Sequence, residues 1–316
     1  MTPPARPPVA PADPHLVMSL PAAGTLLVKG LVSDRRERRG AVRTPDGRPL
    51  RRALDPRVHD PVFVVGAPRS GTTFLGDCLG ALPGVSYHFE PRLTKALVRH
   101  VHRGDWSRRR AAAAFRASYS SLVLAAGDGG RRFVDKTPEN AFITGFLADA
   151  FPTARFVHII RDGRDVTVSH AEKPWLRASS TGSGVRGRGG AAWGASPRFW
   201  VEPEGVDRFP AVSDLERSAW AWRRFTTAAL EGLEALPGSR WTEVRYEELV
   251  TRPAPAVERL AALLELDDRS RRVLADGLSR GRASSVGRWR ERLGPEEEAL
   301  VVAECGPLLP RLGYVR

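Results

Sequence analysis

The sequence predicts an α/β fold, a three-layer sandwich in which helices flank a central, mainly parallel sheet. Short, continuous apolar runs such as residues 62–65 are typical of strands that are buried on both faces. Segments with apolar residues at helical spacing lie between these runs. A β-α-β rhythm of this kind favours parallel pairing, because each crossover returns the chain to the same edge of the sheet.

The first half of this rhythm is the clearer one. We expect strands at 62–65, 85–89, 132–134 and 155–160. Helices are expected at 72–82, where Phe74, Leu75, Cys78, Leu79 and Leu82 share one face, at 139–151, and from Asp162-Gly163 onward. In the second half we expect a helix at 215–236 with a capping box of Ser213 and Glu216, a strand near 241–244, and helices near 256–264, 269–278 and 296–309.

The chain divides into four parts. Residues 1–15 are rich in proline and are expected to form a disordered tail, and residues 16–60 form an N-terminal extension without a clear assignment. The main domain is expected at 61–316. It contains an insertion at about 178–205 that is rich in Gly, Ser and Arg and carries three large aromatic residues, so we expect an irregular loop that acts as a lid over a partly apolar acceptor.

The composition narrows the function classes. The net charge of +13 and the pI near 10.9 favour anionic ligands, but only four of the 49 basic residues are lysine, and so much arginine beside abundant Ala, Gly and Pro is typical of GC-rich coding sequence. The sequence contains no basic helical segment interleaved with aromatic residues, the pattern that would predict nucleic-acid binding. Two cysteines, Cys78 and Cys305, predict neither a disulfide framework nor a metal cluster. Without an expected signal peptide or transmembrane segment, a cytoplasmic protein is the expectation, and the oligomeric state stays open.

A glycine-rich segment directly after the first strand predicts a phosphate-binding loop. Residues 66–73 have the spacing of G-x-x-x-x-G-K-[ST], with Gly66 and Gly71 as the glycines. Backbone N–H groups at such a turn, together with the helix that follows, favour phosphate. Thr72 stands where a nucleotide triphosphatase has lysine, and Arg69 supplies the cation from another point of the loop. The loop therefore predicts a ligand with a 5′-phosphate but no triphosphate chain.

Arg69-Ser70-Gly71-Thr72-Thr73 resembles the [KR]-x-G-T-T loop of the sulfotransferases that use 3′-phosphoadenosine 5′-phosphosulfate (PAPS). The resemblance extends over about residues 61–316 and is strongest to the bacterial and tyrosylprotein-sulfotransferase-like branch. It implies a P-loop-like fold, PAPS as the donor, 3′-phosphoadenosine 5′-phosphate (PAP) as the product, and no metal. Because the insertion departs from the family pattern, the acceptor stays open among small molecules, glycans, lipids and protein tyrosine.

A second segment strengthens this resemblance. In the family, an arginine ends a strand and a serine follows eight residues later, and the pair binds the 3′-phosphate of PAPS. Arg161 and Ser169 stand at these positions. An arginine at a strand end can present two N–H groups to a phosphate dianion.

The C-terminal region adds weaker matches. Residues 244–253 resemble the strand and helix near the nucleotide, which places Tyr246 beside the adenine or ribose or, as an alternative, in the core. Residues 281–293 resemble the loop that closes over the 3′-phosphate. Its candidate ligands are Arg282, Ser284, Ser285 and, as the best match, Arg288.

Three residues near strand ends are candidates for the chemistry. Glu90 ends the second strand and is expected beside the phosphate loop, where the resemblance implies a general base; otherwise it is a carboxylate that pairs with Arg69 or Arg92. His88 is the alternative base, although a histidine in mid-strand more often packs in the sheet. Lys136 follows the third strand and, with Arg69, would stabilise charge on the transferring group, unless it is a solvated lysine at a helix entry.

Two other functions stay open at this point. A P-loop kinase or nucleotide triphosphatase would need a metal-binding acid, for which Asp135 at the end of the third strand is the candidate. A non-catalytic module that binds nucleotides or anionic glycans would use the same loop without turnover.

Overall fold

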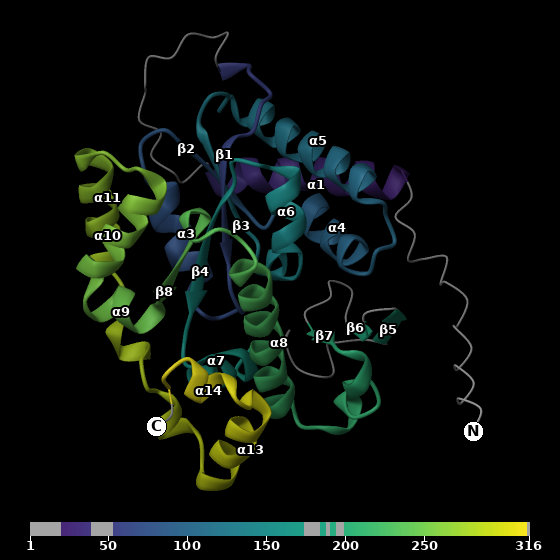
Figure 1. Ribbon diagram of the computed structural model, residues 1–316, viewed down its shortest axis with the longest axis vertical. Helices are drawn as coiled ribbons and strands as arrows, with labels where there is room; N and C mark the ends of the chain where they lie inside the picture. The colour runs from purple at the N-terminus through teal and green to yellow at the C-terminus, as the bar shows by residue number, and fades with distance from the viewer. Residues whose placement is uncertain (1–19, 39–52, 174–183, 188–189, 194–198, 315–316) are drawn as a thin grey trace.

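The computed structural model describes residues 20–38, 53–173, 184–187, 190–193 and 199–314. Within these ranges, five strands form a central sheet in the order β2-β3-β1-β4-β8, and every neighbouring pair is parallel (Figure 1). Their bounds are β1 His59–Val65, β2 Val85–Phe89, β3 Arg132–Lys136, β4 Arg155–Ile160 and β8 Trp241–Arg245. The expected parallel α/β sheet is confirmed, and the predicted strands lie within two or three residues of the observed ones.

Alternation along β1 divides the core into two layers. Phe63 and Val65 face one cluster, which α4 (Arg92–His102), α5 (Arg108–Ala126), α6 (Thr144–Ala150) and α8 (Asp214–Glu234) complete. Val62 and Val64 face the other, with α3 (Thr72–Gly80), α9 (Tyr246–Thr251), α10 (Pro253–Leu264) and α11 (Asp268–Ser279). All four side chains are fully buried, and burying each contributes about 1.5–3 kcal/mol. The three-layer sandwich follows directly.

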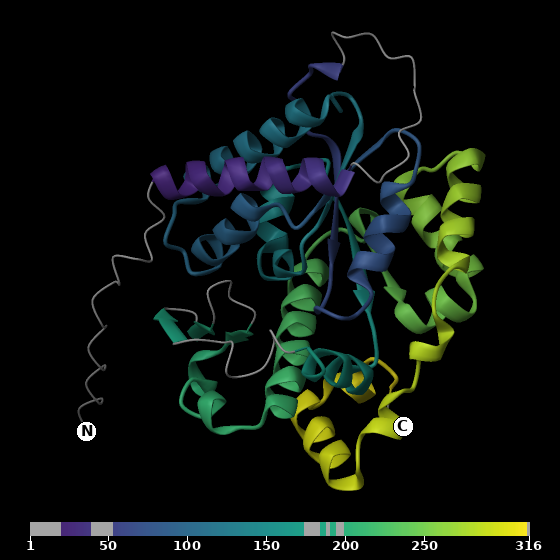
Figure 2. The ribbon, with the colours of Figure 1, turned by 180° about the vertical axis from the view of Figure 1, so that it is seen from behind.

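The N-terminal extension contains a helix. α1 (Leu20–Arg38) crosses α4 and α5 on the outside of the molecule (Figure 2), and Ala23, Leu26 and Leu31 pack against the core beneath it. Sequence analysis assigned neither α4 nor α5. The predicted capping box of Ser213 and Glu216 at the start of α8 is confirmed.

Two expected helices are broken. Residues 139–151 form a 3-10 helix, η2 (Pro138–Ile143), followed by the short α6, because Ile143 leaves helical geometry with φ −135°. The C-terminal helix divides into α13 (Pro295–Cys305) and α14 (Leu308–Arg311). Gly306, with φ 59°, ends the first of these, and Pro307 follows it. Cys78 lies in the core, as predicted.

The insertion contains regular structure where an irregular loop was expected. β5 (Gly184–Gly187), β6 (Gly190–Trp193) and β7 (Phe199–Val201) form an antiparallel sheet. Phe199 lies 5.2 Å from Phe209 between ring centroids, and Trp200 stacks on Phe142 at 4.5 Å. Both aromatic residues are buried and anchor β7 to the domain. The predicted tail at 1–15 lies outside the described residues.

Among the described helices, none combines the length and the apolar character that crossing a membrane requires.

Candidate functional site

The loop between β1 and α3 has the geometry of a phosphate-binding turn. Gly66 has φ 151°, and a Cβ there would lie 2.3 Å from the carbonyl oxygen of Ile159. Gly71 has φ 94°, and a Cβ there would lie 2.4 Å from the Tyr246 ring. Only glycine therefore fits at either position. α3 begins directly after Gly71, so its first N–H groups are left without helical partners at the loop.

Three side chains of this loop differ in exposure. The Ser70 hydroxyl is buried, and no hydrogen-bond partner for it exists among the described residues. Thr72 is also buried, whereas Thr73 is exposed. A buried hydroxyl without a partner is costly, and a bound anion would remove that cost.

Arg69 joins the loop to α7 (Gly163–Ala171). Its Nε donates a hydrogen bond to the Ser169 hydroxyl at 3.1 Å, and its backbone has φ 73°, a left-handed conformation that is uncommon for arginine. Desolvation lowers the pKa of the Arg69 guanidinium, and the positive charge of Arg161 lowers it further. Two cations that are close enough for one to lower the pKa of the other favour the binding of an anion beside them.

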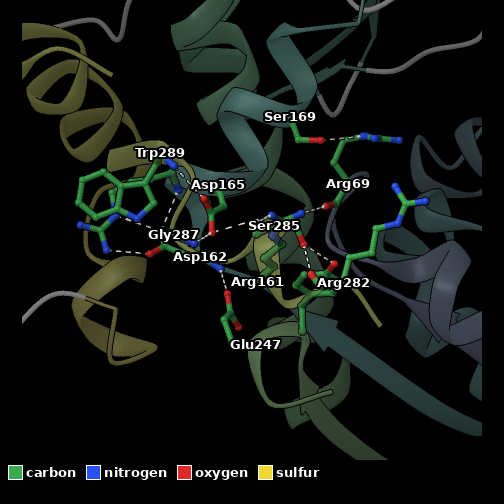
Figure 3. Close-up of polar contacts among 12 residues, drawn as sticks. Arg69, Arg161, Asp162, Asp165, Ser169, Glu247, Arg282, Ser285, Gly287 and Trp289 are labelled. Atoms are coloured by element: carbon green, nitrogen blue, oxygen red, sulfur yellow. Dashed lines mark hydrogen bonds and ion pairs between the residues drawn. The ribbon is translucent and has the colours of Figure 1, made fainter. Parts of the chain in front are cut away.

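Arg161, at the end of β4, lies at the centre of the site (Figure 3). Its Nη1 donates to the Arg69 carbonyl at 3.2 Å, and its Nη2 donates to the Ser285 carbonyl. The guanidinium carbon stands 4.5 Å from the centroid of the Tyr246 ring. Its Nε is buried, and no described residue accepts its hydrogen. Arg161 therefore connects the phosphate loop to the C-terminal loop and retains a donor for a ligand.

Tyr246 and Ser285 complete this centre. The Tyr246 hydroxyl and the Ser285 hydroxyl are 2.6 Å apart, and the Tyr246 ring covers Gly71. The ring thus packs against both Arg161 and Gly71 of the phosphate loop, although Tyr246 is also part of the second core cluster. Both interpretations of this tyrosine from the sequence are compatible with its position.

Sequence analysis did not identify Asp165, which fixes the C-terminal loop. One carboxylate oxygen accepts from the Gly287 N–H at 2.7 Å and the other from the Trp289 N–H at 3.0 Å (Figure 3). The same side chain lies 3.8 Å from Arg161. A signal was present in the sequence, because Asp165 stands four residues after Arg161, the spacing of neighbours on a helix.

The remaining candidates of the C-terminal loop are more exposed. Arg288 pairs with Glu172 at 3.4 Å, and Arg282 and Ser284 are exposed on the 3-10 turn η8 and its flank (Ala283–Ser285). In the view of Figure 3 the Arg282 and Arg69 side chains project to the same side. Arg282 and Arg288 thus belong to the loop that contacts Arg161 through Ser285, but neither side chain is buried.

Glu90 lies at a second centre. β3 separates β2 from β1 in the sheet, so Glu90 follows the second strand from β1 and not, as expected, the adjacent one. Its carboxylate pairs with Lys136 of β3 and with Lys95 of α4, each at 2.6 Å, and with neither Arg69 nor Arg92. Lys95 also pairs with Glu139 at 3.0 Å. Sequence analysis did not identify Lys95 or Glu139 as site residues.

The charges at this second centre are interdependent. Burial opposes ionisation of Glu90, but Lys95 and Lys136 outweigh it and hold the pKa of the Glu90 carboxyl below its usual value. Burial lowers the pKa of Lys136, which is 1% exposed and whose Nζ lies 3.6 Å from the centroid of the Phe89 ring. Lys136 is thus a buried cation rather than a solvated surface lysine. Glu90 has φ 44°, an uncommon backbone conformation that recurs at functional sites.

His88 and Asp135 lie away from this centre. His88 is fully buried, stacks on Phe133, and contacts Ser86 and Asp34 at 2.9 Å each. It packs in the sheet, as a mid-strand histidine usually does. Asp135 is also fully buried.

The surroundings of Asp135 do not suit a metal ligand. Tyr119 donates to its carboxylate at 2.5 Å, Thr137 at 2.6 Å and Asn140 at 3.1 Å. Both oxygens are therefore already engaged in the core. In the part of the chain that the structure describes, no group of three or more His, Cys, Asp or Glu side chains is placed to hold a metal ion.

Several known proteins are similar to this chain in sequence or in fold. Residues 61–183 match the model of a sulfotransferase family. The nodulation protein NoeE of Sinorhizobium fredii is 29% identical over 80% of this chain and 65% of its own length. Protein-tyrosine sulfotransferase A of Caenorhabditis elegans is 21% identical over 80% of this chain and 67% of its own. The chain thus spans about two thirds of the length of these curated relatives.

Solved structures agree on the fold. The sulfotransferase STF9 of Mycobacterium avium superposes with a TM-score of 0.52 at 14% identity, over 97% of this chain and 88% of its own. Because identity is so low, this similarity concerns the fold. Together, the family model over residues 61–183, the curated relatives and this structure show that the chain is similar to sulfotransferases in part of its sequence and in its fold.

Proposed function

We propose that this protein transfers a sulfuryl group from PAPS to a hydroxyl or amine of a small-molecule, glycan or lipid acceptor. The observation that carries the proposal is the meeting of three segments at Arg161. The phosphate loop, the end of β4 and the C-terminal loop all contribute polar groups there, and the family model covers the first two.

The residues around Arg161 fit a nucleotide with phosphates at both ends of its ribose. Ser70 Oγ and Arg161 Nε are buried donors that find no acceptor among the described residues, and Arg69 adds a second cation. The glycine loop of Ser70, Gly71, Thr72 and Thr73 would hold the 5′-phosphosulfate through backbone N–H groups. Arg161 and Ser169, with Arg288 from the C-terminal loop, would hold the 3′-phosphate, and Tyr246 would contact the adenosine.

Glu90 would act on the acceptor. When bound, PAPS supplies a sulfuryl group whose S–O bond to the 5′-phosphate breaks as the acceptor oxygen bonds to sulfur. Glu90 accepts the proton of the acceptor hydroxyl, and its ionised state suits that role. Lys136 and Arg69 oppose the negative charge that develops on the bridging and transferred oxygens. Positioning and electrostatics would supply most of the acceleration, as in phosphoryl transfer.

The printed name of one relative supports a hydroxyl acceptor. The Caenorhabditis elegans protein is named for protein tyrosine, a phenolic acceptor. Glu90, as a carboxylate base, suits a hydroxyl of this kind.

The test is transfer of label from ³⁵S-PAPS to a panel of phenols, glycans and lipid alcohols, with mass spectrometry for a sulfate adduct. Wild-type protein should release PAP and label at least one acceptor class. PAP binding without transfer to any acceptor would favour the non-catalytic module. Tight, Mg²⁺-dependent ATP binding by calorimetry would instead favour the P-loop kinase.

The base assignment has its own variant. Glu90→Gln keeps the shape of the side chain and should lower turnover by roughly 10²–10⁴ while PAP affinity holds. The loss should be smaller for a nitrophenol, which ionises more easily. A folded variant that binds PAP normally and retains full turnover on an alcohol would remove Glu90 as the base.

A further inference from the structure

Glu90 is bound by two ammonium groups that come from different elements. Lys136 Nζ lies 2.6 Å from Oε1, and Lys95 Nζ lies 2.6 Å from Oε2. Both carboxylate oxygens are therefore occupied, and rotation about the terminal carboxylate bond would break two charge-assisted hydrogen bonds. The pair of lysines fixes the plane of the carboxylate.

The two lysines differ in their surroundings. Lys136 is 1% exposed and is packed against the Phe89 ring, so its position is set by the core. Lys95 is 27% exposed and has a second carboxylate partner, Glu139, whose side chain is 6% exposed. One oxygen of Glu139 has no hydrogen-bond partner among the described residues. Lys95 is thus shared between two carboxylates, whereas Lys136 is committed to one.

We propose that Lys95 is a positioning residue for the reaction: it orients the Glu90 carboxylate and holds it ionised, and Glu139 moderates this effect by sharing the charge of Lys95. The inference rests on the proposed function for its catalytic meaning. Its structural content, the control of Glu90 by Lys95, stands on geometry alone.

The charges that face Glu90 support this assignment. Two of them are cations that stabilise its ionised form. Among the described residues, the charged and titratable groups that interact with it are Lys95 of α4, Lys136 of β3, Glu139 of η2 and Tyr87 of β2; Lys136 in turn interacts with Asp77 of α3 and Asp135 of β3. Of the two cations, Lys95 is the one whose removal leaves the sheet core unchanged.

Glu139 acts in the opposite sense. Its negative charge lies against the same ammonium, and burial raises its pKa, which Lys95 opposes. With Glu139 neutral, the positive charge of Lys95 would act on Glu90 alone. Because Glu139 has a raised pKa and Glu90 a lowered one, Glu139 is already neutral in the pH range where Glu90 titrates, so Lys95→Met should shift that titration and Glu139→Gln should not.

The experiment is a pH titration of the Glu90 carboxyl carbon by ¹³C NMR on protein labelled at glutamate, with the signal assigned through Glu90→Gln. Lys95→Met should raise the pKa of Glu90 by about 1–3 units, the effect of one neighbouring charge. Glu139→Gln should leave it nearly unchanged, because Glu139 is already protonated in that pH range. Lys29→Met, which removes an exposed lysine of α1, is the matched control and should leave the signal in place.

Each outcome decides something. A Glu90 titration that does not move in Lys95→Met, or that moves as far in Glu139→Gln as in Lys95→Met, would overturn the inference. Turnover of PAPS on the labelled acceptor class should show an acid limb that follows the NMR titration. If the NMR pKa moves and the acid limb does not, Lys95 controls Glu90 but Glu90 is not the base, and the proposed function loses that residue.

Discussion

Arg69 Nε donates a hydrogen bond to Ser169 Oγ at 3.1 Å, across 100 residues of sequence. The contact joins the phosphate loop to the helix that follows β4, so residues of the two strongest sequence motifs meet directly. Arg161 adds a second connection between the same segments through the Arg69 carbonyl at 3.2 Å. In the family that the sequence resembles, these two segments bind the two phosphate groups of one nucleotide. Here they are in direct contact with each other.

Arg161→Ala should weaken PAP binding by about 2–5 kcal/mol, the range for removing one member of a desolvated charge pair. Arg161 is buried, and no described residue accepts the hydrogen of its Nε. The substitution would therefore remove a cation and a donor that are proposed to contact a phosphate. Calorimetry measures the change. Arg280→Ala, at the C-cap of α11, is the control, because Arg280 is exposed and pairs with Asp276 of that helix. Equal affinities of the two variants would show that Arg161 does not contact the nucleotide.

Asp165→Asn should weaken PAP binding about 5- to 150-fold, since a coupling of 1–3 kcal/mol corresponds to that factor. The substitution removes the charge that opposes Arg161 and disturbs the acceptors of the Gly287 and Trp289 N–H groups. Adenosine 5′-phosphate, which lacks the 3′-phosphate, should lose much less affinity. A similar loss for both nucleotides would assign Asp165 to stability alone.

Gly71→Ala should abolish nucleotide binding and destabilise the protein. A left-handed alanine costs roughly 1–2 kcal/mol, and its Cβ would also meet the Tyr246 ring at 2.4 Å. Gly84→Ala is the matched control, since Gly84 has φ 73° and open space around its Cβ. Urea unfolding and PAP titration should show the backbone cost in both variants and loss of binding in Gly71→Ala only. Normal PAP binding by Gly71→Ala would contradict the loop assignment.

Asp135 predicts a pH dependence of stability. Burial raises the pKa of its carboxyl to about 6, above the unfolded value of 3.8. Its folded form favours the proton, so this contribution is present below pH 3.8 and is lost as pH rises through 6. Relative to Asp135→Asn, the wild-type protein should lose up to about 3 kcal/mol between pH 4 and 7, measured by urea unfolding. A difference between the two proteins that does not vary with pH would contradict the raised pKa.

The sheet and the phosphate loop could be predicted because each depends on short-range pattern. Continuous apolar runs such as 62–65 form strands that are buried on both faces. The two glycines of 66–71 mark backbone conformations that only glycine adopts there. The helix at 139–151 could not be predicted correctly, since apolar periodicity does not distinguish an α-helix from a 3-10 turn that carries buried polar residues such as Asn140. The insertion was predicted as a loop because its strands are short and rich in glycine.

The candidate site was predictable where one residue acts within a motif and not where partners come from elsewhere. Arg161 and Ser169 were identified by resemblance to the family's strand-end arginine and the serine eight residues after it. Lys95 and Glu139 carry no such signal, because their meeting at Glu90 depends on how α4 and η2 pack over the end of β3. The strand order could not be predicted from the sequence either. β3 lies between β2 and β1, and this order places Lys136 next to Glu90.

The most direct test of the account is the affinity of the wild-type protein for PAP compared with adenosine 5′-phosphate, by calorimetry in one buffer. The two ligands differ only in the 3′-phosphate that Arg161, Ser169 and the C-terminal loop are proposed to hold. A charge-assisted contact of about 1.5–3 kcal/mol predicts that PAP binds at least tenfold more tightly. Equal affinity for the two nucleotides would contradict the 3′-phosphate site, and with it PAPS as the donor.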